Sequence, residues 1–452
     1  MYFTDCSTFF TPSLSKEYKI THFSVNKKNK NCTVIHYNNN KEQNLRFVSP
    51  CSHSLFDQSN NIMLATVAKT FTRPAIRAFS VSANIAHTPL FDLHNELKGK
   101  IVEFAGYALP VQYSGVLPEH MAVRGKNTCG LFDVSHMGQI KWTGKDRVEF
   151  LERVLVSDIH SLQPTQGRLT LLCQEDGGII DDTVITNAGD YHYEVVNGAC
   201  KYGDMEHFKK EMAKFQAEGK EVQMEYLGDI GLIALQGAMA PAVLRRFTEF
   251  DVTKMPFMTG QDIKVGGVNC RVTRCGYTGE DGYEVQIPAA DSIPLVKEIL
   301  KEKEVLPCGL GARDSLRLEA GLCLYGTDLS TAVSPVEGTL MWTISKQRRA
   351  DGGFIGHKAI MERMKTCEKK RVGFMVQGAP ARHGAKIYSN GELVGEITSG
   401  TLSPSLKKPV AMGYIKKGLH TAGTQVEVEV RNKKYPAVVT KMPFVPNNYY
   451  RG

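Results

Sequence analysis

The chain has 452 residues, of which 42% are hydrophobic and 23% are charged, and no run of about 18 apolar residues occurs. These values are typical of a soluble globular protein with two or three domains and predict no membrane span. Residues 1–79 hold ten Lys and Arg against four Asp and Glu, so about +2 of the net charge of +8 remains for the rest, which argues against nucleic-acid binding.

The first 79 residues differ in composition from the rest. Residues 1–62 are rich in Asn and Lys and lack a clear helical or strand period, so we predict a disordered extension. Residues 63–79 carry Lys69, Arg73 and Arg77 without an acidic residue, which is typical of a mitochondrial transit peptide and predicts a matrix protein. The alternative is a disordered basic tail, and Met63 is an alternative start of translation.

Helices and short strands alternate irregularly from residue 80 to about residue 350. The helical spacing of Met205, Phe208, Met212 and Phe215 predicts a helix, and Asp204 is its expected N-cap. Frequent hairpins between the strands favour an α+β fold with largely antiparallel sheets. The predicted helices span residues 90–97, 145–155, 240–247, 291–300 and 313–321, and the predicted strands 99–113, 139–143, 169–173, 179–186, 191–196 and 230–236.

A second domain is predicted over residues 351–452, after a charged helical stretch between Lys346 and Lys370. Short, evenly spaced strands separated by turns are typical of a small β-barrel. We therefore expect a body of residues 80–350, built of two lobes, followed by this barrel. The six predicted barrel strands are 371–375, 385–388, 393–397, 410–415, 425–430 and 435–440.

The stretch from Arg271 to Pro288 combines a glycine-rich loop with a half-buried strand. Gly276, Gly279 and Gly282 permit positive φ and close backbone approach. Apolar and polar residues alternate after them, so Glu284 and Gln286 lie on the face opposite Tyr283. This pattern fits either a surface hairpin with a solvated Glu284 or a loop that approaches a ligand.

Asp181 and Asp182 lie in the predicted strand 179–186, on opposite faces that are both mainly apolar. Burial of a carboxylate among apolar groups is costly unless it has a partner. At least one of the two is therefore a candidate for proton transfer or for orienting an amine. The pattern does not choose between them, and a strand-end carboxylate beside solvent is the alternative.

Other chemical signals are weaker. Arg313 and Arg317 lie one helical turn apart, either in ion pairs or holding a carboxylate-bearing ligand. Isolated histidines such as His136 and His383 have no metal-ligand spacing, so we predict no metal site. Nucleotide-binding glycine motifs do not occur, and the eleven cysteines contain no CxxC pair, which favours reduced thiols.

Many ordered motifs resemble the glycine cleavage T-protein family, from about Thr88 to Tyr450. The departures are the extension 1–62 and the order Val196-Asn197-Gly198-Ala199-Cys200, and neither involves the candidate site. The matching motifs are LFDVSHMG, GGIIDD, LIALQG, PFMTG, CRVTRCGYTGEDGYE, ARDSLRLEAGLCLYG, SPVEG, TSGTLSPSLKKPVAMGY and KMPFVPNNYY.

The resemblance implies a three-lobed, cloverleaf-like fold around a channel for tetrahydrofolate. It also implies an aminomethyltransferase that acts on the lipoyl arm of the H-protein, with the P- and L-proteins as indirect partners. By motif match Asp182 would assist attack on the aminomethyl carbon, and Glu284 would bind the pterin edge. The other residues implied to contact the cofactor are Met137 and Tyr277 at the pterin, and Arg313, Arg371 and Tyr449 at the cofactor or its acidic tail.

Two related readings compete with this one. The folate-binding half of a dimethylglycine or sarcosine dehydrogenase would need a flavin domain upstream, whereas only 79 residues precede the body. A folate-binding iron–sulfur assembly factor of the same fold, which is not an enzyme, carries a cysteine motif where this chain has GYTGEDGYE.

Overall fold

The computed structural model describes residues 19–26, 31–38, 41–47 and 85–451. It divides into two units, residues 1–79 and residues 80–452. No helix of the described residues is long and apolar enough to cross a membrane.

The first unit contains a three-stranded antiparallel sheet of order β1-β2-β3. The expectation that residues 1–62 form no secondary structure is therefore wrong for these strands. Each strand carries residues such as Ile, Val, Phe and Tyr that favour extended backbone, and the Asn- and Lys-rich runs lie between strands. The predicted transit peptide, 63–79, lies outside the described residues. The strands are β1 (Lys19–Asn26), β2 (Asn31–Asn38) and β3 (Lys41–Phe47).

An antiparallel five-stranded sheet of order β11-β7-β10-β9-β8 forms the first lobe of unit 80–452. Helices α3 (Arg147–Val154) and α4 (Lys201–Ala217) pack on one face, where Trp142 and Phe208 are fully buried. The sequence predicted Asp204 as the N-cap of α4, and this prediction is wrong. The helix begins one turn earlier, at Lys201, so Asp204 lies inside it. The strands are β7 (Gly138–Thr143), β8 (Gly167–Cys173), β9 (Ile179–Asn187), β10 (His192–Val196) and β11 (Gln223–Tyr226).

A six-stranded sheet of order β13-β14-β15-β12-β6-β16 forms the second lobe, with β16 parallel to β6 and the other pairs antiparallel. The core on one face takes side chains from α1 (Phe91–Glu96), α5 (Ala240–Arg245) and α6 (Ala289–Ile299). The strands are β6 (Cys129–Asp133), β12 (Ile230–Gln236), β13 (Thr259–Val265), β14 (Val268–Arg274), β15 (Gly282–Pro288) and β16 (Val305–Cys308).

The uncovered faces of the two sheets meet each other. Tyr193 and Val195 of β10 share a core with Leu232 and Ala234 of β12. Two further helices close this core, and a small hairpin and a short 3₁₀ helix complete the lobes. These elements are α2 (Val116–Arg124), α7 (Leu310–Glu319), β4 (Lys100–Phe104), β5 (Tyr107–Gln112) and the 3₁₀ helix Val252–Lys254.

The third lobe is a closed six-stranded barrel of order β17-β20-β19-β18-β21-β22, as the strand spacing predicted. The 3₁₀ helix Met341–Thr343, α8 (Lys346–Asp351) and α9 (His357–Thr366) lead into it, so the expected boundary near residue 350 falls at α8. Its strands are β17 (Lys369–Val376), β18 (Lys386–Ser389), β19 (Glu392–Leu402), β20 (Pro409–Lys416), β21 (Gln425–Val430) and β22 (Lys433–Thr440).

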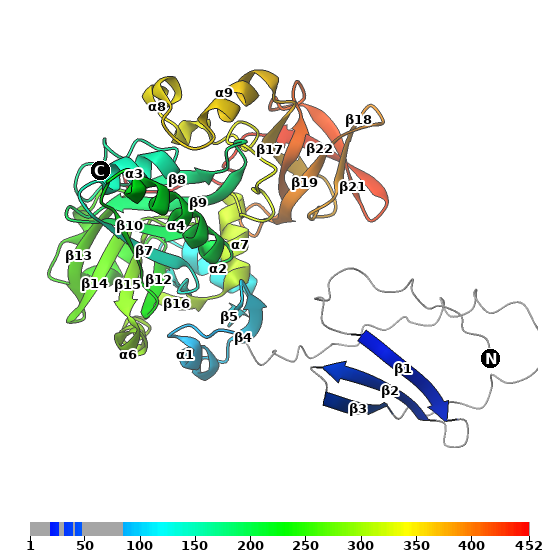
Figure 1. Ribbon diagram of the computed structural model, residues 1–452, viewed down its shortest axis with the longest axis horizontal. Coiled ribbons are helices and arrows are strands. Elements are labelled where there is room, and N and C mark those ends of the chain that lie inside the picture. Colours follow the sequence, from blue (N-terminus) through cyan, green and yellow to red (C-terminus); the bar gives the residue numbers. More distant parts are fainter. Residues whose placement is uncertain (1–18, 27–30, 39–40, 48–84, 452) are drawn as a thin grey trace, which may run out of the picture. The chain divides into compact units, whose positions relative to one another are not determined.

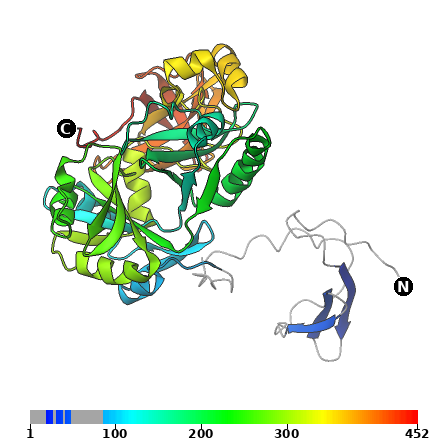
Figure 2. The ribbon, with the colours of Figure 1, turned by 60° about the vertical axis from the view of Figure 1, so that its left-hand side comes forward.

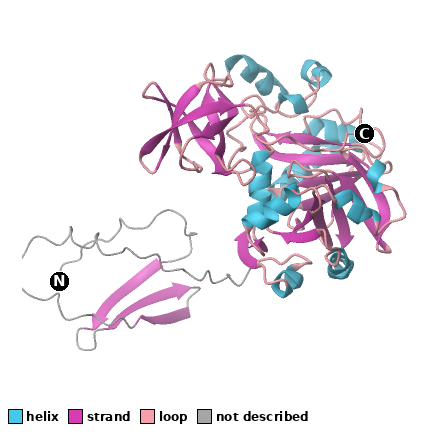
Figure 3. Cartoon of the chain, turned by 180° about the vertical axis from the view of Figure 1, so that it is seen from behind, coloured by secondary structure: helices cyan, strands magenta, loops and turns pink. Residues whose placement is uncertain are grey.

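The pictures show the same α+β arrangement within unit 80–452. The barrel strands gather at one end, beside α8 and α9 (Figure 1). After a turn of 60° the barrel lies behind these two helices, which are yellow (Figure 2). Figure 3 shows helices around the outside of the two sheets, whereas the barrel consists of strands.

Candidate active site

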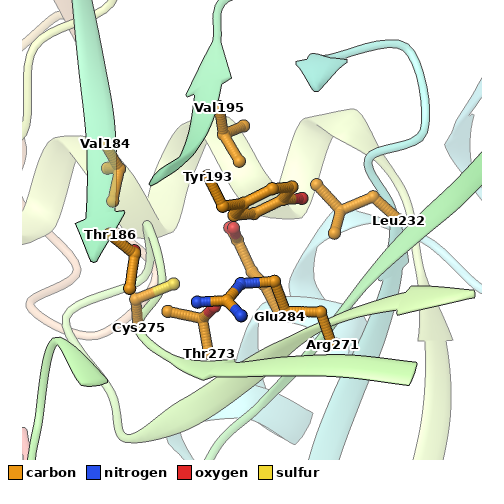
Figure 4. A pocket seen from close by; sticks show the side chains of 9 residues that line it. All are labelled: Val184, Thr186, Tyr193, Val195, Leu232, Arg271, Thr273, Cys275 and Glu284. Carbon is orange, nitrogen blue, oxygen red and sulfur yellow. The ribbon is translucent and has the colours of Figure 1, made fainter. Parts of the chain in front are cut away.

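A narrow space of about 10 Å³ lies between the facing sheets. Ligand pockets usually span roughly 300–1,000 Å³, so the side chains around this space would have to move apart to admit a ring system. Figure 4 shows side chains of both sheets directed toward one another across it, with Glu284 and Arg271 pointing toward Tyr193. The lining residues are Val184, Thr186, Tyr193, Val195, Leu232, Arg271, Thr273, Cys275 and Glu284.

Glu284 projects into this space because β15 alternates as its sequence predicted. Tyr283 and Val285 point into the core of the second lobe and are fully buried, which leaves Glu284 on the opposite face. Burial raises the pKa of Glu284, while the nearby positive charge of Arg313 and a hydrogen bond with Cys275 lower it in part. The alternative of a surface hairpin with a solvated Glu284 is therefore excluded.

Arg313, on α7, provides the cation near Glu284. Its guanidinium lies over the ring of Tyr277, 4.8 Å from the ring centre. Burial lowers its pKa, and Glu284 opposes that effect. Its Nη1 is buried without a hydrogen-bond partner among the described residues. Buried donors are nearly always satisfied, so an orphaned one here is a place for a ligand acceptor.

Tyr277 links this cation to Asp182. It lies in the glycine-rich loop, and its hydroxyl donates to the carbonyl oxygen of Cys323. Burial raises its pKa, and the charges of both Asp182 and Arg313 act on it. Tyr277 is therefore close enough to both the Asp182 carboxylate and the Arg313 guanidinium to be affected by their charges.

The structure distinguishes the two neighbouring aspartates of β9. Asp181 is fully buried and accepts hydrogen bonds from Asn197, at 2.9 Å from the backbone N and 2.8 Å from Nδ2. Asp182 stays partly exposed and lies on the strand face of Val184, which lines the space. Burial, followed by the charge of Asp181, raises the pKa of Asp182 to about 7. A carboxyl group with such a pKa can both hold and release a proton near neutral pH.

The site also involves residues that the sequence analysis did not select. His136 is buried, and its Nδ1 has no partner among the described residues. Burial, then the positive charge of Arg313, lowers its pKa to about 4, so the ring is neutral at physiological pH. Fully buried Lys201 donates to the hydroxyl of Tyr107 at 2.7 Å and to the carbonyl of His136 at 3.1 Å. Isolated polar residues of this kind give no pattern in a sequence.

Met137 and Arg371 have different surroundings. Met137 is half-buried against the core shared by the two sheets. Arg371, on β17, donates from Nε to the carbonyl of Gly338 at 2.9 Å and from Nη1 to the sulfur of Met412 at 3.2 Å. These contacts join the barrel to the chain before it, and none of them involves another predicted site residue. A cofactor contact of Arg371 stays a prediction.

Tyr449 is brought to the glycine-rich loop by the C-terminal segment. Its ring stacks on Phe257 with ring centres 4.4 Å apart. Burial raises its pKa to about 12, and the charges of Arg124, Glu280 and Cys275 act on it. Since Cys275 is hydrogen-bonded to Glu284, Tyr449 lies near the Glu284 end of the site.

A buried ion-pair network holds the C-terminal segment there. Arg124 binds Glu280 of the loop at 2.6 Å and Glu319 of α7 at 3.1 Å. Asn448 donates to Glu280 at 2.9 Å, and its backbone N donates to the carbonyl of Gly279 at 2.8 Å. No group of three or more potential metal ligands occurs in the part of the chain that the structure describes.

Comparisons with known proteins agree with this architecture. Residues 90–348 match the family model described as GCVT N-terminal domain, and residues 369–446 match the glycine cleavage T-protein C-terminal barrel domain. The mitochondrial aminomethyltransferase of Dictyostelium discoideum is 45% identical over 397 residues, covering 85% of this chain and 98% of that protein. The chain belongs to the glycine cleavage T-protein family.

Two further relatives extend the match within the T-protein family. The human mitochondrial aminomethyltransferase is 48% identical over 371 residues, covering 81% of this chain and 91% of that protein. The crystal structure of glycine cleavage system aminomethyltransferase T from Bartonella henselae superposes with a TM-score of 0.75 at 37% identity, covering 81% and 99%. The T-protein resemblance first noted in the motifs is thus confirmed, as is the α+β fold with a barrel.

Proposed function

We propose that Glu284, Arg313 and Asp182 mark the tetrahydrofolate site of this glycine cleavage aminomethyltransferase. The reaction takes the one-carbon unit from S-aminomethyl-dihydrolipoyl H-protein and yields 5,10-methylenetetrahydrofolate, ammonia and dihydrolipoyl H-protein. The family assignment supports the enzyme class, since the matched relatives are named aminomethyltransferases. No comparison favours the alternative of an iron–sulfur assembly factor.

The observation that carries the folate site is the position of the buried Glu284 carboxyl group near the guanidinium of Arg313. Glu284 offers two acceptor oxygens on a buried strand face, and Arg313 offers an unused donor. The reduced pterin has adjacent N–H donors and a carbonyl acceptor, which complement these two groups. Tyr277, Met137 and Tyr449 would add apolar and aromatic surface.

Bound tetrahydrofolate would supply the nitrogen atoms that accept the carbon. The protein then needs to orient the reactants and to handle protons, rather than to provide a nucleophile of its own. Asp182, with its pKa near 7, would hold a proton or give it up at its carboxylate oxygens during the transfer. His136 is neutral and would leave the site without a further positive charge.

Partner and compartment follow from the same family. The lipoylated H-protein would deliver the aminomethyl group, and the P- and L-proteins would act through it. The curated relatives are named mitochondrial, which fits the basic, acid-free segment 63–79 and a location in the matrix.

The test is reconstitution of the reaction with purified protein. We expect methylenetetrahydrofolate and ammonia in equal amounts when tetrahydrofolate and aminomethylated H-protein are both supplied, and none when the H-protein lacks its lipoyl group. Absence of product with both substrates present would contradict the proposal. Product formed at the same rate without the lipoyl group would contradict the assigned partner.

A further inference from the structure

A second pair of carboxyl groups lies behind Asp182, on the side of β9 that faces α4. Asp181 and Asp204 are both fully buried, and their side chains are hydrogen-bonded to each other. Among the described residues, no N–H or O–H group other than this carboxyl contact reaches either oxygen of Asp204. Ionised carboxylates only accept hydrogen bonds, so this contact requires a proton between the two.

The surroundings keep that proton in place. The largest charge effects on Asp204 come from carboxylates, namely Asp181 and Asp182 of β9 and Glu194 of β10. The neighbouring uncharged groups, the Cys200 thiol before α4 and the Tyr325 hydroxyl, bring no positive charge. Burial, then the charge of Asp181, raises the pKa of Asp204 to about 9.

Asn197 connects this pair to Asp182. Its Nδ2 donates to Oδ1 of Asp181 at 2.8 Å and to Oδ1 of Asp182 at 3.2 Å, and its backbone N donates to Oδ2 of Asp181 at 2.9 Å. One amide group is thus shared between the buried carboxylate and the one that faces the site. A displacement of Asp181 would move Asn197 and, through it, Asp182.

We propose that Asp204 is a positioning residue for the transfer reaction: its protonated carboxyl group holds Asp181 against Asn197, and Asn197 orients the carboxylate of Asp182. This inference rests on the proposed function, because it takes Asp182 as the group that handles the proton. Loss of the Asp204 proton at alkaline pH places two negative charges side by side and releases the network. Activity then falls as the pH rises past the titration of Asp204.

The experiment compares the full chain with its Asp204→Asn and Asp204→Leu variants by kcat and KM for tetrahydrofolate between pH 6 and pH 10. Asn keeps the shape and one donor for Asp181 but cannot ionise. We expect Asp204→Asn to stay within about 3-fold of wild-type kcat at pH 7.5 and to lose the alkaline decline. Asp204→Leu should lose about 10- to 100-fold in kcat with KM unchanged, the scale expected for misplaced groups.

Glu211→Gln is the matched control, because Glu211 is a buried acid on the same helix that pairs with Lys214 instead. It should leave kcat and the pH profile as they are. The proposal is overturned if folded Asp204→Leu keeps wild-type kcat, or if Asp204→Asn keeps the wild-type alkaline decline. If the Leu variant does not fold, the pH profile of Asp204→Asn alone still tests the proposal.

An Asp182→Asn variant, measured in parallel, separates this inference from the proposed function. If Asp182→Asn retains full turnover, the role of Asp182 is wrong and the inference is overturned with it. If Asp182→Asn is inactive while Asp204→Leu is fully active, Asp182 keeps its role and the positioning by Asp204 alone is refuted.

Discussion

Two buried carboxyl centres, one at Glu319 and one at Asp182, differ in the donors around them. Glu319 receives hydrogen bonds from Ser403, Ser405 and Arg124 and faces His120 at 3.2 Å. Burial alone would raise its pKa, but these partners, His120 first, lower it to about 2. Asp182 has one shared amide donor and a carboxylate neighbour, and its pKa rises to about 7.

This difference in hydrogen-bond donors gives the two carboxyl groups different roles: Glu319 stabilises the structure, whereas Asp182 is available for chemistry. Every acceptor of Glu319 is used, so it joins α7, α2, the barrel loop at Ser403 and the C-terminal segment, whose Phe444 and Val445 bond to its backbone carbonyl. Asp182 keeps unused acceptor capacity and an accessible proton. Polar groups that the protein itself leaves unsatisfied are the ones available to a substrate.

The largest expected effect is on turnover at Asp182. Asp182→Asn retains shape but cannot exchange a proton, so kcat should fall by about 10²- to 10⁴-fold. Folate affinity should stay within a few-fold, and thermal stability should not fall, because a like charge beside Asp181 is removed. Steady-state kinetics and calorimetric binding check this. Wild-type kcat in the variant would exclude Asp182 from the mechanism.

The opposite pattern is expected at Glu319. Glu319→Gln leaves Arg124 and His120 without their shared anion, and breaking a buried ion pair costs about 3–5 kcal/mol of unfolding free energy. The kcat of the protein that remains folded should stay within a few-fold. Denaturant unfolding measures the loss, with the exposed Lys126→Ala as control. Unfolding free energies equal to wild type would show that Glu319 is not a structural centre.

The two centres should also respond to pH in opposite directions. For Asp204 and Asp182 the folded pKa values, about 9 and about 7, exceed the unfolded value of 3.8, so the folded state binds more protons. Stability therefore falls as the pH rises from about 4 to 9. For Glu319 the folded pKa is the lower one, and its contribution is lost as the pH falls from about 4.5 toward 2.

Melting curves at pH 6 and pH 9 check the first half of this prediction. Asp204→Asn should reduce the drop in Tm between these pH values by about 2 °C or more, since 1 kcal/mol corresponds to roughly 2–4 °C in domains of 150–250 residues. An unchanged drop would mean that Asp204 is ionised in the folded state at pH 6.

The smallest effect is expected at the C-terminal segment. Asn448→Ala removes the hydrogen bonds to Glu280 that hold Tyr449 near the loop, so KM for folate should rise about 3- to 10-fold while kcat stays near wild type. Asn447→Ala is the matched control, because Asn447 is an exposed neighbour. Equal KM values for the two variants would separate this segment from folate binding.

Much of the fold could be predicted because apolar and polar residues alternate in β15 and because turns separate the short, evenly spaced strands of the barrel. β6 was missed because all five of its residues, Cys129–Asp133, are buried, so no alternation marks it. Asp204 was mistaken for a helix cap because Asp is common there, whereas α4 begins at Lys201.

Some features of the candidate site could also be predicted from the sequence, whereas others could not. Glu284 could be assigned to a face from local alternation, but Asp181 and Asp182 could not be distinguished, since both faces of β9 are apolar. Their difference depends on Asn197 and α4 on one side and on the second sheet on the other. The hydrogen bonds of Arg371 connect it to none of the other predicted residues, because its partners are backbone and sulfur atoms of the barrel junction.

The central claim is that Glu284 and Asp182 serve one folate site with different tasks, Glu284 in binding and Asp182 in proton handling. Calorimetric titration of tetrahydrofolate into wild type, Glu284→Gln and Asp182→Asn tests it most directly. The account predicts a Kd at least about 10-fold weaker for Glu284→Gln, because a charge-assisted hydrogen bond is lost, and within a few-fold of wild type for Asp182→Asn. Wild-type affinity in Glu284→Gln would contradict it.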